Sequence, residues 1–577
     1  MYSSILTGAV HGIDSYLMKV ETDISNGLPS FNMVGFMSGE MREAGERVRV
    51  ALKNLGIHLP PQRITVNLSP AGIPKRGILV DLPVCVGLLV CLDYLQPEAT
   101  EGVLVAGELG LNGEIRPVKG ILPIVAEAKN KGVSTCLVPN GNLSEGALVH
   151  GIRVVGVRTL AEMVNYLRKN QKERDRFLPP AEVDAGQLLS KAVNKSYPDF
   201  SSVHGQRQAK KVLEIAAAGF HNVLMMGPPG TGKSMLARCL PGILPPLTQE
   251  EALEITRIYS VSGRLPEETA LITERPFIAP HHSVTRAVLI GGGNIPSPGL
   301  ITLAHLGVLF LDEISEYSLP DLNSLREPLE NHEIVIRRLF GTYRYPARPL
   351  LVAAANPCPC GYYPDMNRCT CTPREVQKYQ RKISGPLMDR IDFRVHVSRV
   401  SADDLQGSDS EESSETIRGR VMEAIERQKN RFKGTPFNYN SDMTPDALEH
   451  FCPLNSLLAE KMKGIYERLG MSMRSYHKTL KMARTIADLN GREMILERDL
   501  MTAVGFRLPE YSEDEYSSGR EFDAGKRIEH RAVNYNVNSD GNASAVCESE
   551  GCYESEGFYE SEGYYEIEEF CESEGDR

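Results

Sequence analysis

The chain has 577 residues, enough for several domains, and carries 64 Lys and Arg against 75 Asp and Glu. The last 31 residues hold 12 of the acidic side chains and one basic one, so the first 546 residues are neutral overall. A content of 41% hydrophobic and 24% charged residues is typical of soluble globular proteins. The longest apolar stretch, 82–92, is too short to cross a bilayer, the N-terminus lacks the features of a secretion signal, and twelve cysteines are too few for a disulfide scaffold. We therefore expect a cytoplasmic protein without a membrane segment.

The first 168 residues mix strand and helix patterns, which predicts an α+β domain. Residues 5–24 alternate loosely, as strands do, and 103–110 and 135–139 have the character of short strands. The segment 38–55 has a helical pattern instead. One side of this expected helix carries Met41, Val48, Ala51 and Leu52.

The rest of the chain divides by composition. The polar segment 169–198 contains two adjacent prolines and is interpreted as a linker. From 199 to 400 short apolar strands alternate with helices, which predicts a parallel α/β sheet. Residues 401–508 begin with a polar loop and continue as a small α-helical domain. The acidic tail, 509–577, is expected to be disordered because its six-residue repeats contain too little apolar material to bury.

A complete G-x-x-x-x-G-K-S loop stands between an apolar strand, 223–226, and a helix-like run. Its glycines allow backbone N–H groups to approach phosphate oxygens, and the helix N-terminus adds positive potential. Lys233 would reach the β- and γ-phosphates of ATP, and Ser234 would bind Mg²⁺. The predicted nucleotide-binding residues are Gly227, Pro228, Pro229, Gly230, Thr231, Gly232, Lys233 and Ser234.

Two further apolar strands end in polar residues that suit the same chemistry. The strand 307–311 ends in Asp312, which would hold Mg²⁺ directly or through water, and Glu313, which would polarise the attacking water. The strand 350–355 ends in Asn356, whose amide would help to place that water beside the γ-phosphate. The alternative for Asn356 is that it only caps its strand.

Together with 203–206 (VHGQ) and 384–392 (SGPLMDRID), these motifs resemble the magnesium-chelatase-like branch of the AAA+ ATPases. The resemblance implies a parallel sheet flanked by helices and followed by an α-helical lid. It also implies that Arg390 is an arginine finger, which reaches the nucleotide of a neighbouring subunit when a ring assembles. The alternative is an arginine that pairs with Asp389 or Asp392 of its own subunit.

The segment 472–477 (SMRSYH) matches the sensor 2 segment of this branch, which implies that Arg474 contacts the γ-phosphate. A surface helix arginine is the alternative. We expect one ATP to be hydrolysed by residues of one subunit and Arg390 of the next. The residues expected from the first subunit are Lys233, Ser234, Asp312, Glu313, Asn356 and Arg474.

Four cysteines form a C-x-C–x8–C-x-C cluster between Asn356 and Arg390. Four thiolates this close can enclose a tetrahedral Zn²⁺, and a structural metal would brace the loop that joins the two site residues. Disulfides, free thiols or an iron–sulfur cluster are the alternatives. The predicted ligands are Cys358, Cys360, Cys369 and Cys371.

The segment 330–348 reads as two strand-like runs around Gly341, and in this branch a β-hairpin projects here toward the pore of the ring. Its cations and aromatic rings suit contact with a nucleic-acid backbone. A solvated hairpin, or one that packs on a neighbour, is the alternative. The proposed DNA contacts are Arg337, Arg338, Tyr343 and Arg344, with Arg348, Phe340 and Tyr345 beside them. The loop 291–294 (GGGN) is either a second pore insertion or a simple turn.

The N-terminal region, at 66–81 and 104–139, resembles the proteolytic domain of Lon-type Ser/Lys proteases. Leu79 stands where that family has its nucleophilic serine, and the segment 117–124 has no lysine after Lys119. A leucine cannot attack a carbonyl group, so we expect a retained fold without protease activity and with a binding role, such as contact with a protein partner.

This order of domains is similar to that of the ComM/YifB family over about residues 1–508. The family implies a cytoplasmic bacterial protein that assembles as a ring, expected to be a hexamer, and its ComM members are implied to be branch-migration helicases in natural transformation. We therefore expect an α/β chain with an AAA+ ATPase module, a Lon-like N-terminal domain and an acidic tail, which acts on branched or single-stranded DNA. A protein-remodelling chaperone and a magnesium-chelatase-type motor subunit are the alternatives, and Leu79 disfavours an ATP-dependent protease.

Overall fold

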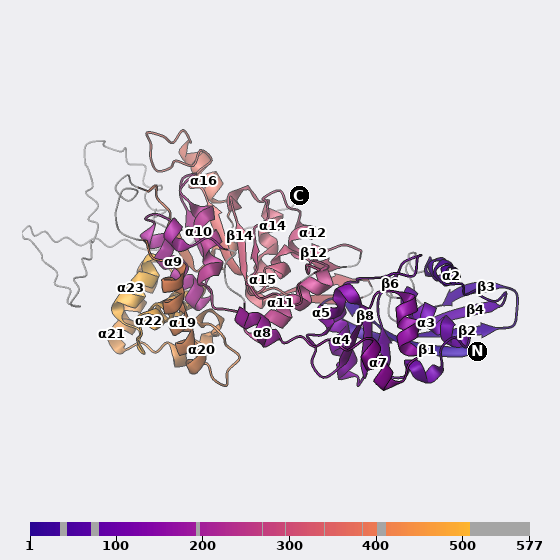
Figure 1. Cartoon of the computed structure of the whole chain (residues 1–577). Coiled ribbons are helices and arrows are strands. Elements are labelled where there is room, and N and C mark those ends of the chain that lie inside the picture. The colour runs from indigo at the N-terminus through magenta and orange to yellow at the C-terminus, as the bar shows by residue number, and fades with distance from the viewer. Residues whose placement is uncertain are drawn as a thin grey trace, which may run out of the picture. The chain divides into compact units, whose positions relative to one another are not determined.

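The computed structural model (Figure 1) describes residues 1–34, 43–70, 80–191, 197–267, 269–294, 296–339, 341–383, 385–400 and 411–507, all within one compact unit, Met1–Glu510. Leu79, Phe340, Ser384, Met41 and the acidic tail, for which we predicted roles or conformations, lie outside these residues. No helix in the described ranges is long and apolar enough to cross a membrane.

A seven-stranded sheet organises the N-terminal region. Its order is β3(Ser30–Val34), β4(Arg63–Ser69), β2(Asp14–Ser25), β1(Tyr2–His11), β5(Val103–Val105), β8(Thr135–Pro139) and β9(Arg153–Val157). The pairs β1–β2 and β2–β4 are antiparallel and the other four are parallel. The strands expected at 5–24 and 135–139 are present, and the one expected at 103–110 is broken into β5 and β6(Glu108–Leu109), which pairs with β7(Ile115–Arg116).

The helices of this region are α2(Ala44–Asn54), α3(Asp81–Cys91), α4(Ile121–Asn130), α5(Leu143–Gly146) and α6(Leu160–Leu167). Every residue of α3 is buried, which explains why the longest apolar stretch of the sequence lies here: it is a core helix. Val48, Ala51 and Leu52 of α2 are buried as expected. The segment interpreted as a linker contains two short helices, α7(Gln171–Phe177) and α8(Ala185–Lys191).

A second sheet of five parallel strands forms the centre of the chain. Its order is β11(Phe277–Ile278), β14(Val308–Leu311), β17(Leu350–Ala355), β10(Val223–Met226) and β18(Phe393–His396). Its helices are α9(Arg207–Gly219), α10(Lys233–Cys239), α11(Gln249–Ser262), α12(Arg286–Ile290), α13(Leu300–Leu303), α14(Leu319–Ser324), α15(Arg326–Asn331), α16(Pro373–Gln380) and α17(Gly385–Met388). Two antiparallel ribbons extend from it, β12(Gly291–Gly292) with β13(Ser297–Pro298), and β15(Glu333–Arg338) with β16(Gly341–Pro346).

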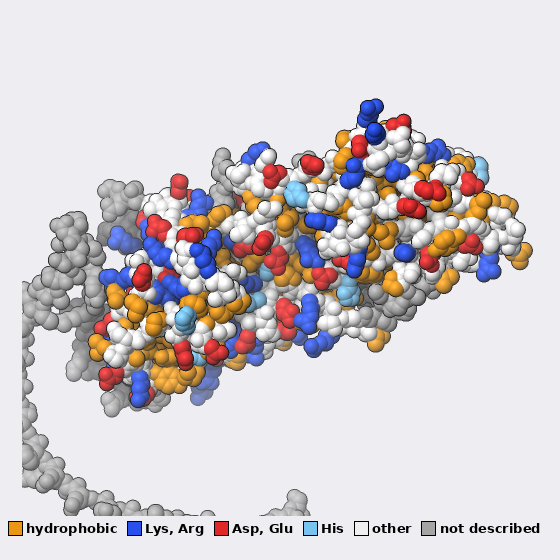
Figure 2. Space-filling model, turned by 90° about the horizontal axis from the view of Figure 1, so that it is seen from below, with side chains coloured by type: hydrophobic (Ala, Val, Ile, Leu, Met, Phe, Trp, Pro, Cys, Tyr) orange, Lys and Arg blue, Asp and Glu red, His pale blue; other side chains and the backbone are white. Residues whose placement is uncertain are grey.

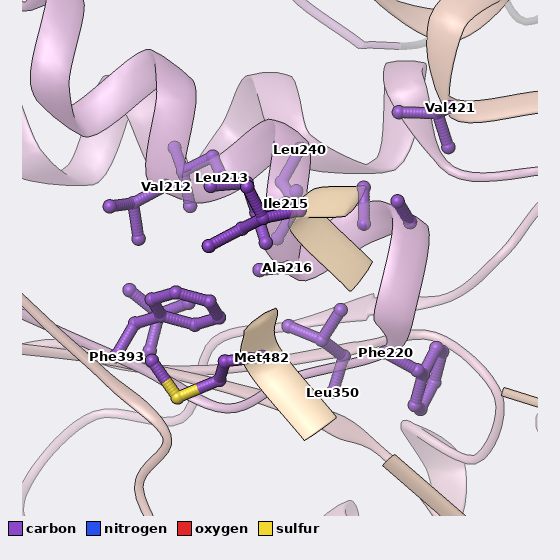
Figure 3. Packing of buried hydrophobic residues seen from close by; sticks show 14 of the residues in the cluster. Val212, Leu213, Ile215, Ala216, Phe220, Leu240, Leu350, Phe393, Val421 and Met482 are labelled. Atoms are coloured by element: carbon purple, nitrogen blue, oxygen red, sulfur yellow. The ribbon is translucent and has the colours of Figure 1, made fainter. Parts of the chain in front are cut away.

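Within residues 411–507 the lid consists of the helices α19(Ser414–Arg431), α20(Pro445–Phe451), α21(Ser456–Arg468), α22(Met473–Leu489) and α23(Glu497–Gly505). They are drawn in orange and yellow beside α9 in Figure 1. Figure 3 shows how α9 joins sheet and lid: its Ile215 lies among Phe393 of the sheet and Val421 and Met482 of the lid. Because one buried cluster spans both, burial of apolar surface holds the lid against the sheet.

Candidate active site

The carboxyl ends of three neighbouring strands carry the predicted nucleotide residues. The strand β10 leads into the loop 227–234, β14 leads into Asp312 and Glu313, and β17 leads into Asn356. Because these strands are parallel and adjacent, their carboxyl ends meet at one edge of the sheet, where α/β proteins bind ligands. The structure therefore brings together residues that are far apart in the sequence.

Direct contacts link these residues. The Ser234 hydroxyl donates to Oδ2 of Asp312 at 2.7 Å. The Lys233 ammonium donates to Oδ1 of Asn356 at 3.3 Å and to the carbonyl oxygens of Gly227 at 2.7 Å and Pro228 at 2.8 Å. A hydroxyl and a carboxylate in contact can share one Mg²⁺, and the ammonium lies beside the loop that would surround the phosphates.

The electrostatics of Lys233 suit a polyanion. Its side chain is buried, and this burial lowers the pKa of the ammonium, while the carboxylates of Asp312 and Glu313 oppose the shift. A cation that has lost most of its hydration attracts a phosphate more strongly than an exposed lysine does.

The backbone of Glu313 adopts a left-handed conformation, with φ +49°, which is uncommon for a residue other than glycine. Its carboxylate is half exposed, and Oε2 lies 3.8 Å from Nδ1 of His282. Sequence reasoning did not place His282 in this site. The signal was its position four residues beyond the end of β11, because β11 and β14 are parallel neighbours and their ends share one edge.

Arg390 and Arg474 lie at the opposite edge of the same sheet. They line a cavity of about 540 Å³ together with Asn222, which precedes β10, and Asp392, which precedes β18. The loop 227–234 follows the other end of β10, and a strand of four residues separates the two edges by about 13 Å.

The sequence led us to expect Arg474 at the nucleotide of its own subunit, whereas the structure places it at the amino edge. The lid helix α22 packs against α9 and places Arg474 beside Arg390 and away from the phosphate loop. Arg390 also pairs with neither Asp389 nor Asp392, the alternative that the sequence left open.

Both arginines instead bind Glu330, at the C-terminal end of α15, which the sequence did not single out. Arg390 Nη2 donates to Oε2 of Glu330, and Arg474 Nη2 donates to Oε1 at 2.8 Å. Partial burial raises the pKa of the Glu330 carboxyl, but the two guanidinium groups outweigh it and hold the pKa below its ordinary value.

The four predicted cysteines converge. Their sulfur atoms all lie within 4.8 Å of one another, and three of the separations are 3.3, 3.8 and 3.6 Å. A tetrahedral site with Zn–S bonds of about 2.3 Å needs sulfur separations of about 3.8 Å. Although desolvation raises the pKa of the Cys360 thiol, backbone N–H groups of Tyr362 and Thr370 lower it to about 6. The cluster therefore fits a metal that binds thiolates.

The cysteine loop approaches the phosphate loop closely. Gly361 has φ +85°, and a Cβ at this position would lie 2.6 Å from Cδ of Pro229. Gln380 of α16 donates to the carbonyl oxygen of Pro357, the residue between Asn356 and the first cysteine. A metal in the cluster would therefore hold a loop that begins next to Asn356 and touches Pro229 of the phosphate loop.

The hairpin expected at 330–348 is present as β15 and β16. Arg337 and Arg338 are exposed near its tip, whereas Arg344 is exposed but pairs with Glu333 at 2.8 Å. The ring of Tyr343 stacks on His11 at 4.4 Å between centroids. Basic and acidic side chains are interspersed over the face in Figure 2, so a DNA contact there would have to rest on a local group of cations.

Two residues beside the proposed DNA contacts have structural roles. The hydroxyl of Tyr345, which is buried, donates to the carbonyl oxygen of Pro296 at 2.7 Å. Arg348 binds both oxygens of Asp442 at 2.6 and 2.7 Å and lies over the rings of Phe220 and Tyr439. Both side chains therefore have partners within this chain.

In the N-terminal region the turn 117–120 leads into α4, whose first residue, Ile121, is fully buried. The lysine of this turn, Lys119, packs on Gly263 at the end of α11: a Cβ there would lie 2.3 Å from its Cε. Lys119 therefore makes a structural contact with the central region.

Comparison with known families covers most of the chain. Residues 199–405 match the family "Magnesium chelatase, subunit ChlI", 411–507 match "Magnesium chelatase, subunit ChlI C-terminal", and 20–142 match "Subunit ChlI of Mg-chelatase".

Two relatives match over nearly their whole length, and a third matches over a part. Competence protein ComM of Haemophilus influenzae is 38% identical over 506 residues, which is 87% of this chain and 97% of that protein. The uncharacterized protein YifB of Escherichia coli is 39% identical over 511 residues, or 88% and 97%. Lon protease 2 of Bacillus subtilis is 30% identical over 187 residues, 28% of this chain and 33% of that protein, in agreement with a Lon-like fold of the N-terminal region.

Proposed function

We propose that this chain, which belongs to the ComM/YifB family of magnesium-chelatase-like AAA+ proteins, hydrolyses ATP in a ring of identical subunits and uses the energy to move DNA. The observation that carries the ATPase proposal is the contact of Ser234 with Asp312 and of Lys233 with Asn356 at the carboxyl edge of the sheet.

Each residue of this edge has a role in phosphoryl transfer. The Lys233 ammonium exchanges its carbonyl partners for β- and γ-phosphate oxygens, and Asn356 and Glu313 orient a water molecule against the γ-phosphorus. Ser234 and Asp312 would hold Mg²⁺, which when bound neutralises charge on the same phosphates. Attack by the water breaks the bond between the γ-phosphorus and the bridging oxygen, and ADP leaves.

Arg390 and Arg474 both act on the nucleotide of the neighbouring subunit. Their position at the amino edge supports this assignment, since the phosphate loop of the same chain lies at the other edge. Two guanidinium groups that meet the γ-phosphate only in the ring would stabilise the charge of the transition state and make hydrolysis depend on assembly.

The four cysteines bind a structural Zn²⁺. The sulfur separations and the N–H groups directed at Cys360 support this assignment. The ion would stiffen the loop between Asn356 and α16, and we assign it no chemical step.

The DNA proposal rests on the hairpin and on the relatives. Arg337 and Arg338 are exposed cations near the tip of a projecting hairpin, which suits contact with phosphates. The name of the ComM relative ties that protein to competence. We therefore favour a branch-migration helicase in recombination or natural transformation. The Lon-like region has lost protease activity and is available for a protein partner.

The test is the ATPase rate of the purified protein without DNA and with single strands, duplex and a four-way junction, at several salt concentrations. We expect stimulation that is strongest with the junction and weakens with salt. Lys233→Ala is the inactive control. The double variant Arg337→Ala with Arg338→Ala should show less stimulation by DNA but the same ATPase rate without DNA.

A Lys233-dependent rate that no DNA changes would overturn the DNA proposal and favour a protein-remodelling chaperone. The match to the chelatase family favours a second candidate, a motor subunit that drives Mg²⁺ insertion into a porphyrin. A metallation assay with partner subunits distinguishes it, because a DNA motor should not support that reaction.

A further inference from the structure

Glu330 connects the two arginines that the proposed function assigns to the neighbouring subunit. Arg390 comes from the segment after α17 and Arg474 from the lid helix α22, yet each donates to a different oxygen of this one carboxylate. Glu330 therefore ties the core to the lid through the two groups that would have to meet a phosphate.

Arg390 makes more hydrogen bonds within the chain than Arg474 does. Its Nε donates to the carbonyl oxygen of Arg326 at 3.1 Å and its Nη1 to that of Pro386 at 2.7 Å, so all three nitrogens of the guanidinium have an acceptor. Its side chain is 12% exposed, against 39% for Arg474. Three of the five N–H groups of this guanidinium are therefore engaged within the chain, which leaves one N–H on each Nη for a phosphate.

The other two carboxylates of the cavity have a different character. Asp392 pairs with Lys478 at 2.7 Å, Asp442 pairs with Arg348, and their side chains are 9% and 13% exposed. Glu330 is 46% exposed. A carboxylate that is half in water loses little hydration in its ion pair and regains it easily on release, so among these three groups Glu330 is the one that can be displaced.

We propose that Glu330 is a displaceable positioning residue: it holds Arg390 and Arg474 together in the isolated subunit and yields them to the phosphates of the neighbouring subunit's nucleotide when the ring forms. This proposal rests on the proposed function. Carboxylate and phosphate oxygens accept the same hydrogen bonds from a guanidinium, and the more highly charged phosphates win the exchange. As long as Glu330 binds the two arginines, it opposes ring assembly.

The test compares the wild type with Glu330→Gln, which keeps the size of the side chain but removes its charge. Assembly is measured by sedimentation with a non-hydrolysable ATP analogue, and ATPase rate is measured against subunit concentration. We expect the concentration at half-maximal assembly to fall about three- to tenfold, since the two ion pairs of this half-exposed carboxylate no longer oppose it. The rate per assembled ring should change less.

The matched control is Glu327→Gln, an exposed residue of the same helix, which should leave the midpoint unchanged. In an Arg390→Ala and Arg474→Ala background, Glu330→Gln should have no effect. Two results overturn the proposal. One is that Glu330→Gln still lowers the concentration at half-maximal assembly in that background. The other is that the folded Glu330→Gln single variant assembles at the same concentration as the wild type or at a higher one.

Failure of the proposed function would be recognised separately. In that case the wild type would lack Lys233-dependent hydrolysis or would not assemble with the analogue at all. A wild type that hydrolyses ATP and assembles, with a Glu330→Gln variant that behaves like it, would refute only the role of Glu330.

Discussion

The two edges of the central sheet carry different groups of side chains. At the carboxyl edge, Lys233 already contacts Asn356, and Ser234 already contacts Asp312. At the amino edge, Arg390 and Arg474 share Glu330 within one chain. The first edge joins the residues predicted to bind the phosphates, whereas the second holds two arginines about 13 Å away from the phosphate loop.

This difference gives a physical reason for a ring. A strand of four residues keeps the two edges about 13 Å apart, and no side-chain rotation closes that distance. Under the proposed function, a second copy completes the site by placing its carboxyl edge against the amino edge of the first. Variants at the two edges should therefore differ in whether they lose nucleotide binding or only turnover.

We expect the largest effect on ATP hydrolysis from substitutions at the carboxyl edge. Lys233→Ala should abolish ATP hydrolysis and weaken nucleotide binding strongly, because the ammonium contributes to both the bound state and the transition state. Glu313→Gln should still bind ATP but hydrolyse it about 10²–10³-fold more slowly. Titration with a fluorescent ATP analogue and a steady-state assay separate the two. A Lys233→Ala variant with normal turnover would break the assignment of this edge.

Substitutions at the amino edge should lower the turnover of ATP but leave nucleotide binding intact. Arg390→Ala should lower kcat by about 10³-fold with nearly unchanged nucleotide affinity, and Arg474→Ala should do so to a smaller extent. Mixing either variant with Lys233→Ala should restore activity, because mixed rings contain interfaces with one intact edge from each partner. If Arg474→Ala were not rescued by mixing, its action within its own subunit, as the sequence implied, would be correct after all.

The cysteine cluster should affect stability more than chemistry. Cys358→Ser should lower bound zinc from about one ion per chain to a small fraction and reduce the melting temperature by about 5–10 °C. Metal analysis and thermal unfolding check this. Thr370→Ala, an exposed residue of the same loop, should keep both values. Full zinc content in the Cys358→Ser variant would remove this residue from the ligand set.

The smallest effect concerns the buried carboxylate of the amino edge. Burial raises the pKa of Asp392, but Lys478 and His221 outweigh it and hold the pKa well below the ordinary value near 4. The unfolded chain then takes up the proton first, so this contribution to stability is full above about pH 4 and is lost as the pH falls below it.

The matched comparison is with Asp392→Asn combined with Lys478→Met, which removes both charges. The free energy of unfolding of the wild type relative to this variant should decline by roughly 1–3 kcal/mol between pH 5 and pH 2. Denaturant unfolding at several pH values measures it. A difference that does not depend on pH would contradict a depressed Asp392 pKa.

Local motifs were predictable because each depends on a few consecutive residues. The strand 223–226, the loop after it, and the polar residues after 311 and 355 could be read in order, and the structure places them at one edge. The cysteine spacing likewise predicted convergence of the four sulfurs. The same reading could not foresee the partners of Tyr345 and Arg348, because residue type does not reveal a contact with Pro296 or Asp442.

The sequence by itself determined the G-x-x-x-x-G-K-S loop, the acidic and amide residues that join it, the convergence of the four cysteines and the family of the fold, because short spacing and strand order carry that information. Only the tertiary structure decided where Arg474 lies, that Glu330 holds it with Arg390, and that His282 faces Glu313. Those relations depend on how the lid packs on α9 and on which strands become neighbours, and contacts between such distant segments leave no local pattern in the chain.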